Sequence, residues 1–122
     1  MNKSPYDFIF DYLPRKVITK QMFGMHYIYL DKKIMLILRK AANDPYMNGI
    51  WVATVKEHHQ SLEQDVPALT DFLLDTGEMY VSDWRLIKDD DDEFETAAIT
   101  VCELITRGDK RIGKATKKSV AL

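Results

Sequence analysis

Three histidines and one cysteine are the side chains of this chain best suited to metal binding or nucleophilic chemistry. His58 and His59 are adjacent, so their side chains diverge and do not form the i, i+4 pair that chelates zinc. His26 lies in a separate stretch. Cys102 lies on an apolar stripe, where no cation or helix N-terminus would lower the pKa of its thiol. We therefore expect no metal site, no cofactor and no catalytic nucleophile.

Five consecutive acidic residues occupy positions 89–93. A calcium-binding loop alternates its ligands and places a glycine at its turn, and this run has neither feature. Acidic side chains near the start of a helix interact favourably with the helix dipole. The run therefore predicts a solvated helix start, with Asp91 or Asp92 as the N-cap.

The C-terminal segment carries a marked charge asymmetry. Residues 107–118 hold six basic residues and one acidic residue, a net charge of +5, whereas residues 83–95 hold seven acidic and two basic residues, a net charge of −5. A basic segment can follow a phosphate backbone, so a small nucleic-acid-binding domain is one alternative function. The candidate contact residues are Arg107, Lys110, Arg111 and Lys114.

A second copy of the chain is another candidate partner. The two charged segments flank one expected helix, whose ends would lie about 20 Å apart at 1.5 Å per residue, so one molecule is not expected to neutralise itself. Two antiparallel copies would bring each acidic end to the other's basic end in an isologous pair. This arrangement predicts a homodimer that weakens as ionic strength rises.

Aromatic side chains provide further candidate contacts, because protein interfaces favour tryptophan and tyrosine as anchors. Tyr46 falls in residues 40–48, which are rich in turn-forming types and predict a mobile loop. Trp84 begins a short β-prone stretch. Tyr46 and Trp84 are therefore candidate interaction residues.

The elements that would position these side chains predict an α+β fold. Four apolar, β-rich stretches follow one another with only short turns or one loop between them, which is typical of an antiparallel meander. These expected strands are residues 17–23, 26–30, 34–39 and 49–54. Gly24 is expected to mark a bulge or a sharp bend.

Two further stretches, 79–81 and 84–87, are short and β-prone, and at least one should join the sheet. We therefore expect an antiparallel sheet of four to six strands, with helices packed on one face.

Three longer helices are expected besides a short helical turn at 58–62. Ser4 and Pro5 would start the first, which ends before Pro14. Asp65 with Pro67 would start the second. It would carry Leu69, Phe72 and Leu73 and close at Thr76–Gly77.

The third helix follows the acidic run and carries one apolar stripe from Phe94 to Ile105. Gly108 is its expected C-terminal cap.

The length of 122 residues suits one domain. We expect a single domain over residues 1–114 and a basic, flexible tail over residues 115–122. A single cysteine excludes an internal disulfide and fits a reducing compartment. No apolar run approaches the roughly 20 residues of a membrane span, and no signal-peptide pattern opens the chain. The expectation is a cytoplasmic protein without membrane association.

Three groups of residues resemble the TfoX N-terminal domain family. The first is Met-Phe-Gly at 22–24 with Ile-Tyr at 28–29, and the second is Asn-Gly-Ile-Trp-Val-Ala-Thr at 48–54. The third begins with Trp-Arg-Leu at 84–86 and ends with Gly-Asp-Lys-Arg-Ile-Gly-Lys at 108–114. The resemblance spans residues 12–114. It implies an α+β domain with an antiparallel sheet and an association with the regulation of natural competence, and it supplies no catalytic residues.

The leading hypothesis is a non-enzymatic, cytoplasmic interaction or regulatory module that binds a protein partner through the open face of its sheet or by self-association. Besides nucleic-acid binding, a second alternative is an enzyme whose site assembles from residues far apart in the sequence. Its candidate residues are His26, Glu57, His58 and Arg111.

Overall fold

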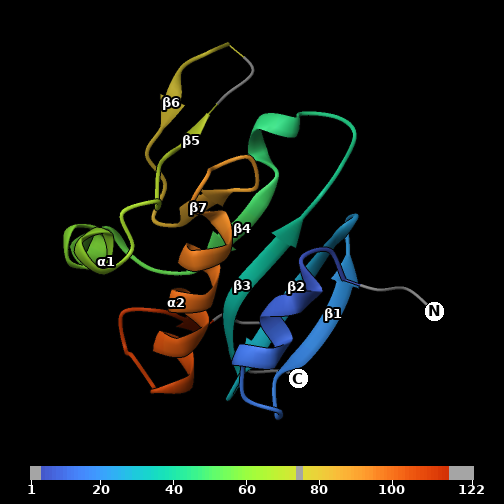
Figure 1. Ribbon diagram of the computed structural model, residues 1–122, viewed down its shortest axis with the longest axis vertical. Helices are drawn as coiled ribbons and strands as arrows, with labels where there is room; N and C mark the ends of the chain where they lie inside the picture. Colours follow the sequence, from blue (N-terminus) through green and yellow to red (C-terminus); the bar gives the residue numbers. More distant parts are fainter. Residues whose placement is uncertain (1–3, 74–75, 116–122) are drawn as a thin grey trace.

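The computed structural model describes residues 4–73 and 76–115. Within them, a six-stranded antiparallel sheet has the order β1-β2-β3-β4-β7, and β8 pairs with β3 (Figure 1). Its strands are β1 (Ile18–Met22), β2 (Met25–Leu30), β3 (Lys33–Arg39), β4 (Gly49–Val52), β7 (Arg85–Lys88) and β8 (Lys114–Ala115). The predicted α+β fold with an antiparallel sheet of four to six strands is confirmed. Of the predicted tail, only Ala115 is described, and it ends β8.

Two tight turns produce the meander from local sequence. Phe23 and Gly24, between β1 and β2, have φ angles of 53° and 73°, and Asp31 and Lys32, between β2 and β3, have 53° and 67°. Positive φ at both central residues is the mark of a type I′ turn, whose twist matches that of the flanking strands. The sharp bend predicted at Gly24 is therefore a hairpin turn.

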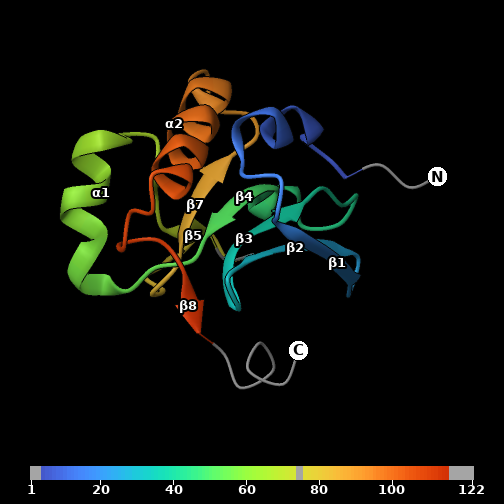
Figure 2. The same ribbon diagram turned by 90° about the horizontal axis from the view of Figure 1, so that it is seen from below.

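One face of the sheet carries the main core. Ile28, Leu36 and Val52 point from neighbouring strands into the cluster that includes the buried face of α2 (Phe94–Thr106). Figure 2 shows α2 and the 3₁₀ helix η1 (Asp7–Tyr12) on this side of the sheet. The predicted apolar stripe is confirmed, because α2 buries Phe94, Ala97, Ala98, Val101, Cys102, Leu104 and Ile105. The helix ends just before Gly108, whose φ is 78°.

The opposite face, called the open face below, has an apolar layer of its own. Alternate side chains along the strands point to it, as the period of two requires. A register shift between Ile28 and Tyr29 adjusts the pairing of β2 with β3. The layer consists of buried Tyr29, Ile34, Ile37 and Ala53, with half-buried Met25, Tyr27, Trp51 and Trp84 packed against them.

The second helix lies earlier in the chain than predicted. The short 3₁₀ helix η3 (Lys56–His58) leads into α1 (His59–Asp65), so the predicted turn at 58–62 belongs to this helix. The helix expected from Asp65 and Pro67 onward is wrong, because Val66 already has φ −135° and ψ 81°. Phe72–Leu73 instead form β5, which pairs with β6 (Met79–Tyr80). Long-range packing of Phe72 against Trp51 overrides the helical spacing of the apolar residues.

The first helix also starts later than Ser4 and Pro5 predicted. Tyr6 precedes η1 in the left-handed region, at φ 56°. Its hydroxyl oxygen lies 2.9 Å from both the Arg39 carbonyl and the Asp89 carboxylate, which share its single proton as acceptors. These contacts fix Tyr6 outside the helix. Burial, followed by the Asp89 hydrogen bond, raises the pKa of this phenol.

The start of α2 differs from the prediction by a small shift. Its N-cap is Glu93, without a side-chain capping bond, rather than Asp91 or Asp92. The Asp91 carboxylate accepts the Glu93 N–H at 2.8 Å, and the Asp91 carbonyl accepts the Phe94 N–H at 3.0 Å. Asp91 therefore forms an Asx turn that leads into the helix.

Native Cys102 is expected to react slowly with a thiol reagent. The side chain is fully buried in α2, and burial raises the pKa of its thiol to about 12, so the reactive thiolate is scarce. Labelling with a chromogenic disulfide should be slow in buffer and fast in denaturant. Equal rates in the two conditions would contradict the buried position.

Gly24, in the turn between β1 and β2, and Gly49, the first residue of β4, should differ in their tolerance of alanine. At Gly49, φ is 144° and an added Cβ would lie 2.0 Å from the Ile87 carbonyl oxygen, whereas at Gly24, φ is 73° and nothing lies within 4 Å. Gly49→Ala should lower the free energy of unfolding by about 3 kcal/mol or more, and Gly24→Ala by about 1–2 kcal/mol. Urea unfolding of both variants measures the difference. A mild effect at Gly49 would contradict the close approach of β4 and β7.

Candidate functional site

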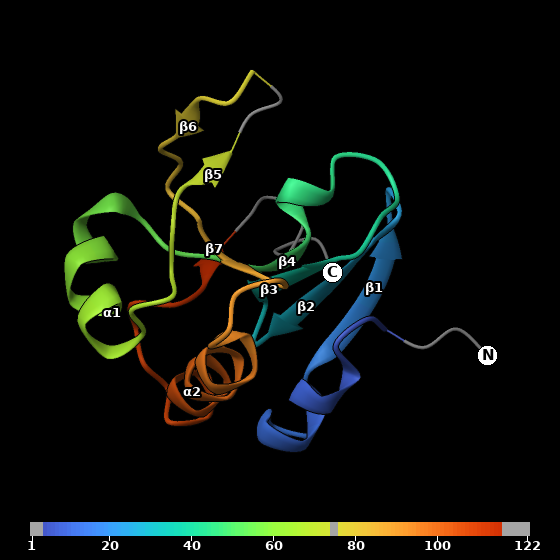
Figure 3. The same ribbon diagram turned by 45° about the horizontal axis from the view of Figure 1, so that its top comes forward.

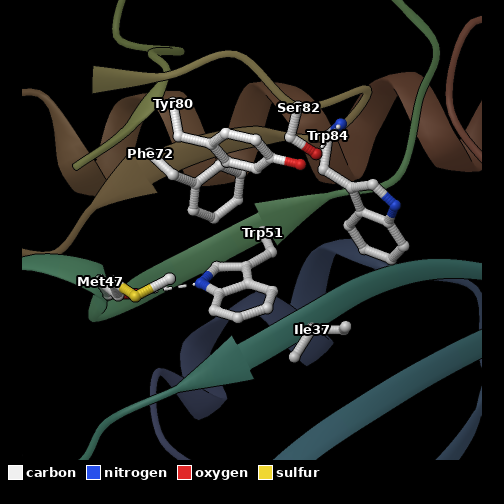
Figure 4. A pocket seen from close by; sticks show the side chains of 7 residues that line it. All are labelled: Ile37, Met47, Trp51, Phe72, Tyr80, Ser82 and Trp84. Atoms are coloured by element: carbon white, nitrogen blue, oxygen red, sulfur yellow. Dashed lines mark hydrogen bonds between the residues drawn. The ribbon is translucent and has the colours of Figure 1, made fainter. Parts of the chain in front are cut away.

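A pocket of about 200 Å³ opens on the open face where the sheet meets the β5–β6 ribbon. Figure 4 shows side chains from several elements surrounding a common opening. Four of them are aromatic. The lining residues are Ile37, Met47, Trp51, Phe72, Tyr80, Ser82 and Trp84. Of the residues proposed from sequence, Trp84 lies here.

Trp51 forms the part of the pocket that belongs to the sheet. It pairs in register with Ile37 across β3 and β4. Its indole N–H donates to the Met47 carbonyl at 3.0 Å. The Phe72 ring meets it edge to face, with centroids 5.1 Å apart and an interplanar angle of 84°. Contacts from both sides therefore fix the orientation of this ring.

The β5–β6 ribbon supplies the outer wall. Figure 3 shows it projecting away from the sheet. Phe72 pairs with Tyr80 across the ribbon, but Phe72 is buried whereas Tyr80 is 53% exposed. Met79 and Val81, on either side of Tyr80, are also more than half exposed. Three consecutive apolar residues thus stand in solvent beside the pocket.

A buried arginine holds the base of this ribbon against the sheet. Arg85 on β7 is only 5% exposed. Its guanidinium pairs with Glu63 of α1 at 2.8 Å and with Asp71, the residue before Phe72. Thr70 and Leu86 exchange backbone hydrogen bonds at 2.9 and 3.0 Å. These contacts place β5 over Trp51.

Tyr46, the other aromatic residue proposed from sequence, lies beside the pocket rather than in it. It belongs to η2 (Pro45–Met47), is half-buried and donates its hydroxyl to Asp44 at 2.9 Å. The segment 40–48 was expected to be a mobile loop, but internal hydrogen bonds organise it. Arg39 donates to the Asn48 side chain at 2.7 Å and to two loop carbonyls. Met47, the neighbour of Tyr46, is the residue that reaches the pocket.

The basic residues proposed from sequence lie in other surroundings. Arg111 pairs with Asp65 at 2.8 Å and with Asp109 at 2.7 Å. The hydrogen bond from Arg111 is the main cause that lowers the pKa of Asp109. Arg107 and Lys110 are exposed. Arg107 and Arg111 share a separate polar hollow of about 430 Å³.

One premise of the predicted salt-sensitive homodimer is wrong. Lys114, from the basic segment, lies 3.4 Å from Asp83, from the acidic segment of the same chain. The chain turns back after α2 and brings β8 alongside β3, so the two segments are not held apart by the length of the helix. Part of the charge asymmetry is thus neutralised within one molecule.

In the described part of the chain, the candidate residues of the enzyme alternative do not contact one another through hydrogen bonds or ion pairs. No hydrogen bond or ion pair there links His26, Glu57, His58 and Arg111, and Arg111 is engaged by two aspartates. His59, which adjoins His58, makes a 2.6 Å hydrogen bond with the Asp83 carbonyl. The His26 Nδ1 atom is buried without a hydrogen-bond partner. Among the described residues, no group of three or more histidine, cysteine or acidic side chains could hold a metal ion.

Sequence reasoning missed most of the pocket. The sequence places Trp51 in a strand of the sheet and predicts a helix for Phe72, so it does not indicate that the two rings meet. A usable signal existed in the alternation of Tyr80, Ser82 and Trp84, because a period of two places these side chains on one side of an extended segment.

Comparisons of the chain with protein-family models, with curated proteins and with solved structures find no match. The resemblance to the TfoX N-terminal domain family therefore stays a prediction that rests on the residues quoted above. In the described part of the chain, no helix has the length and the apolar character needed to cross a bilayer.

The Asp109–Arg111 pair should make stability depend on pH in the acid range. Because the pKa of Asp109 is lowered in the folded state, its stabilising contribution is present above the unfolded value near 3.9 and is lost as pH falls through the folded value. Arg111→Gln should therefore flatten the decline of unfolding free energy below about pH 4. Urea unfolding between pH 2.5 and 6 measures how steeply the free energy of unfolding changes with pH in the parent and in the variant. Identical slopes in the variant and the parent would contradict the assignment.

Proposed function

We propose that this chain is a non-enzymatic interaction module that engages a protein partner through the pocket and the adjoining β5–β6 ribbon. The observation that carries the proposal is the continuity of the aromatic pocket with exposed Met79, Tyr80 and Val81. Binding hot spots are rich in tryptophan and tyrosine and lie in well-packed pockets. Exposed apolar patches of this kind mark interaction sites.

The chemistry of the lining supports binding rather than catalysis. Among the described residues that line the pocket, the polar side-chain groups are the Ser82 and Tyr80 hydroxyls and two indole N–H groups. The Ser82 hydroxyl oxygen already accepts the backbone N–H of Trp84 at 3.1 Å. A catalytic site needs a nucleophile, a base and a group that orients the base, and this lining offers no carboxylate or imidazole to act as the base.

The charges near the site support a protein partner rather than nucleic acid. Lys114 and Arg111 are paired with carboxylates of the same chain, which reduces the positive potential that a phosphate backbone requires. Of the four basic residues proposed from the sequence, Arg107 and Lys110 remain exposed, and neither lines the aromatic pocket.

The proposed regulatory role follows from the TfoX resemblance. Two of the resembling segments contain pocket residues, since Trp51 lies in the stretch 48–54 and Trp84 begins the stretch 84–86. A buried single cysteine suits a reducing compartment, and we propose the cytoplasm as the site of action. Within this proposal the module would act in the regulation of natural competence.

Site-specific photo-crosslinking tests the interaction surface. A photoreactive amino acid at position 80 should capture a defined partner in extracts of the native host, because Tyr80 projects from the proposed surface. The same amino acid at position 12, where Tyr12 is exposed beside α2, serves as the matched control. Met79→Ser with Val81→Ser should reduce capture at position 80 by about tenfold or more.

Two results would contradict this function. One is capture of the same partner with equal yield at position 12. The other is loss of the partner on neutralising exposed Arg107 and Lys110 but not on changing Met79 and Val81, which would move the interface to the basic segment.

A further inference from the structure

The pocket on the open face is walled by aromatic rings that come from three strands and one connecting segment. Trp51, Phe72, Tyr80 and Trp84 surround the opening in Figure 4. The cavity measures about 200 Å³. Since a cavity of roughly 150 Å³ accepts one benzene molecule, this one has room for a single compact group.

The electrostatics of the rings favour a positive group. The faces of aromatic rings carry negative potential, most strongly in tryptophan, and attract cations within about 6 Å. No basic side chain lines the pocket among the described residues. Lys114 lies near this part of the chain through its contact with Asp83, and that carboxylate offsets its charge. A cation entering the pocket would therefore meet attraction without a competing positive charge.

The hydrogen bonds and ion pairs already made around the pocket determine which kind of cation it favours. The Met47 carbonyl already accepts the indole N–H of Trp51, and the Ser82 hydroxyl oxygen accepts the backbone N–H of Trp84. The carboxylates adjacent in sequence, Asp71 and Asp83, are engaged by Arg85 and Lys114. A primary ammonium, a guanidinium or a metal ion would lose its hydration in the pocket and gain the hydroxyl oxygens of Tyr80 and Ser82 but no free carboxylate.

A methylated ammonium avoids that cost. It carries a positive charge but has no N–H donor when fully methylated, and its methyl groups can pack on apolar walls. Ile37 and Met47 supply such walls beside the rings. Rings and apolar side chains together therefore match a trimethylammonium group better than any other cation.

The edge of β6 indicates what carries this group. Within the described residues, β6 pairs with β5 alone, so its outer edge is open beside the pocket. An open strand edge can add an extended peptide through main-chain hydrogen bonds while a side chain enters a neighbouring pocket. We propose that the pocket binds the trimethylammonium group of a trimethylated lysine in the protein partner. This proposal rests on the proposed function, because it names the group that the same surface recognises.

Tryptophan fluorescence reports occupancy directly, because both tryptophans of the chain line the pocket. The protein would be titrated with a short glycine- and serine-flanked peptide that carries one trimethyllysine. Two control peptides carry unmodified lysine or the neutral isostere in which carbon replaces the ammonium nitrogen. Choline serves as a free source of the same group. The trimethyllysine peptide should bind about tenfold or more tightly than either control peptide and more tightly than choline.

Variants then assign the effect to the rings. Tyr80→Leu and Trp84→Leu keep apolar bulk but remove the π system, and each should weaken binding of the trimethyllysine peptide by about tenfold. Tyr12→Leu, a change of an exposed tyrosine outside the pocket, should leave binding unchanged. Tyr80 is more than half exposed, so its variant should keep the parent's melting temperature and test binding rather than folding.

The outcomes separate this proposal from the proposed function. Equal affinity for the neutral isostere would overturn recognition of the charge, and equal affinity for choline would overturn the protein source of the group. Absence of binding by every trimethylammonium probe at millimolar concentration would overturn the inference as a whole. Photo-crosslinking at position 80 would then show separately whether a partner still uses this surface.

Discussion

The arrangement of the open face depends on one buried cation. Arg85 has almost no contact with solvent, and its charge is balanced by Glu63 from α1 and by Asp71 from the approach to β5. An arginine buried without such partners would cost several kcal/mol, so the three segments are constrained to meet. The Thr70–Leu86 bridge lies next to this point and extends the attachment along the backbone. Phe72 can therefore pack on Trp51, and the pocket exists because the ion pairs hold the ribbon there.

The same strands contribute side chains to both faces of the sheet, the core face and the open face. Leu36 and Leu38 of β3 enter the core beneath α2, whereas Ile37 between them faces the pocket. The core side is closed by a helix whose apolar stripe is continuous. Within residues 4–73 and 76–115, the open side receives the short ribbon and the turn at Met47. A single alternating strand thus connects the stability of the domain to the shape of its candidate binding site.

The parts of the fold that local sequence determines were predictable. The first four strands follow from β-rich stretches, of which the first three are joined by type I′ turns, and α2 follows from its apolar stripe and acidic start. Long-range contacts determine the rest. Leu69, Phe72 and Leu73 have helical spacing, yet the packing of Phe72 on Trp51 draws the segment into a strand. The pairing of Lys114 with Asp83 likewise depends on the path of the chain after α2, which charge patterning does not contain.

The hairpin of β1 and β2 has a bearing on how the protein behaves when it is concentrated. β1 stands at the end of the strand order, and Ile18 and Phe23 near it are 59% and 83% exposed. An outer strand with solvent-exposed apolar side chains is a template for intermolecular β-pairing. Lys16 precedes this strand and pairs with Asp31 at 3.2 Å, whereas Lys20 lies within the strand and brings positive charge to it, as gatekeeper residues do in natural sheets. Colloidal stability at high concentration therefore depends in part on this edge, remote from the pocket, and on the charge that Lys20 places within the strand.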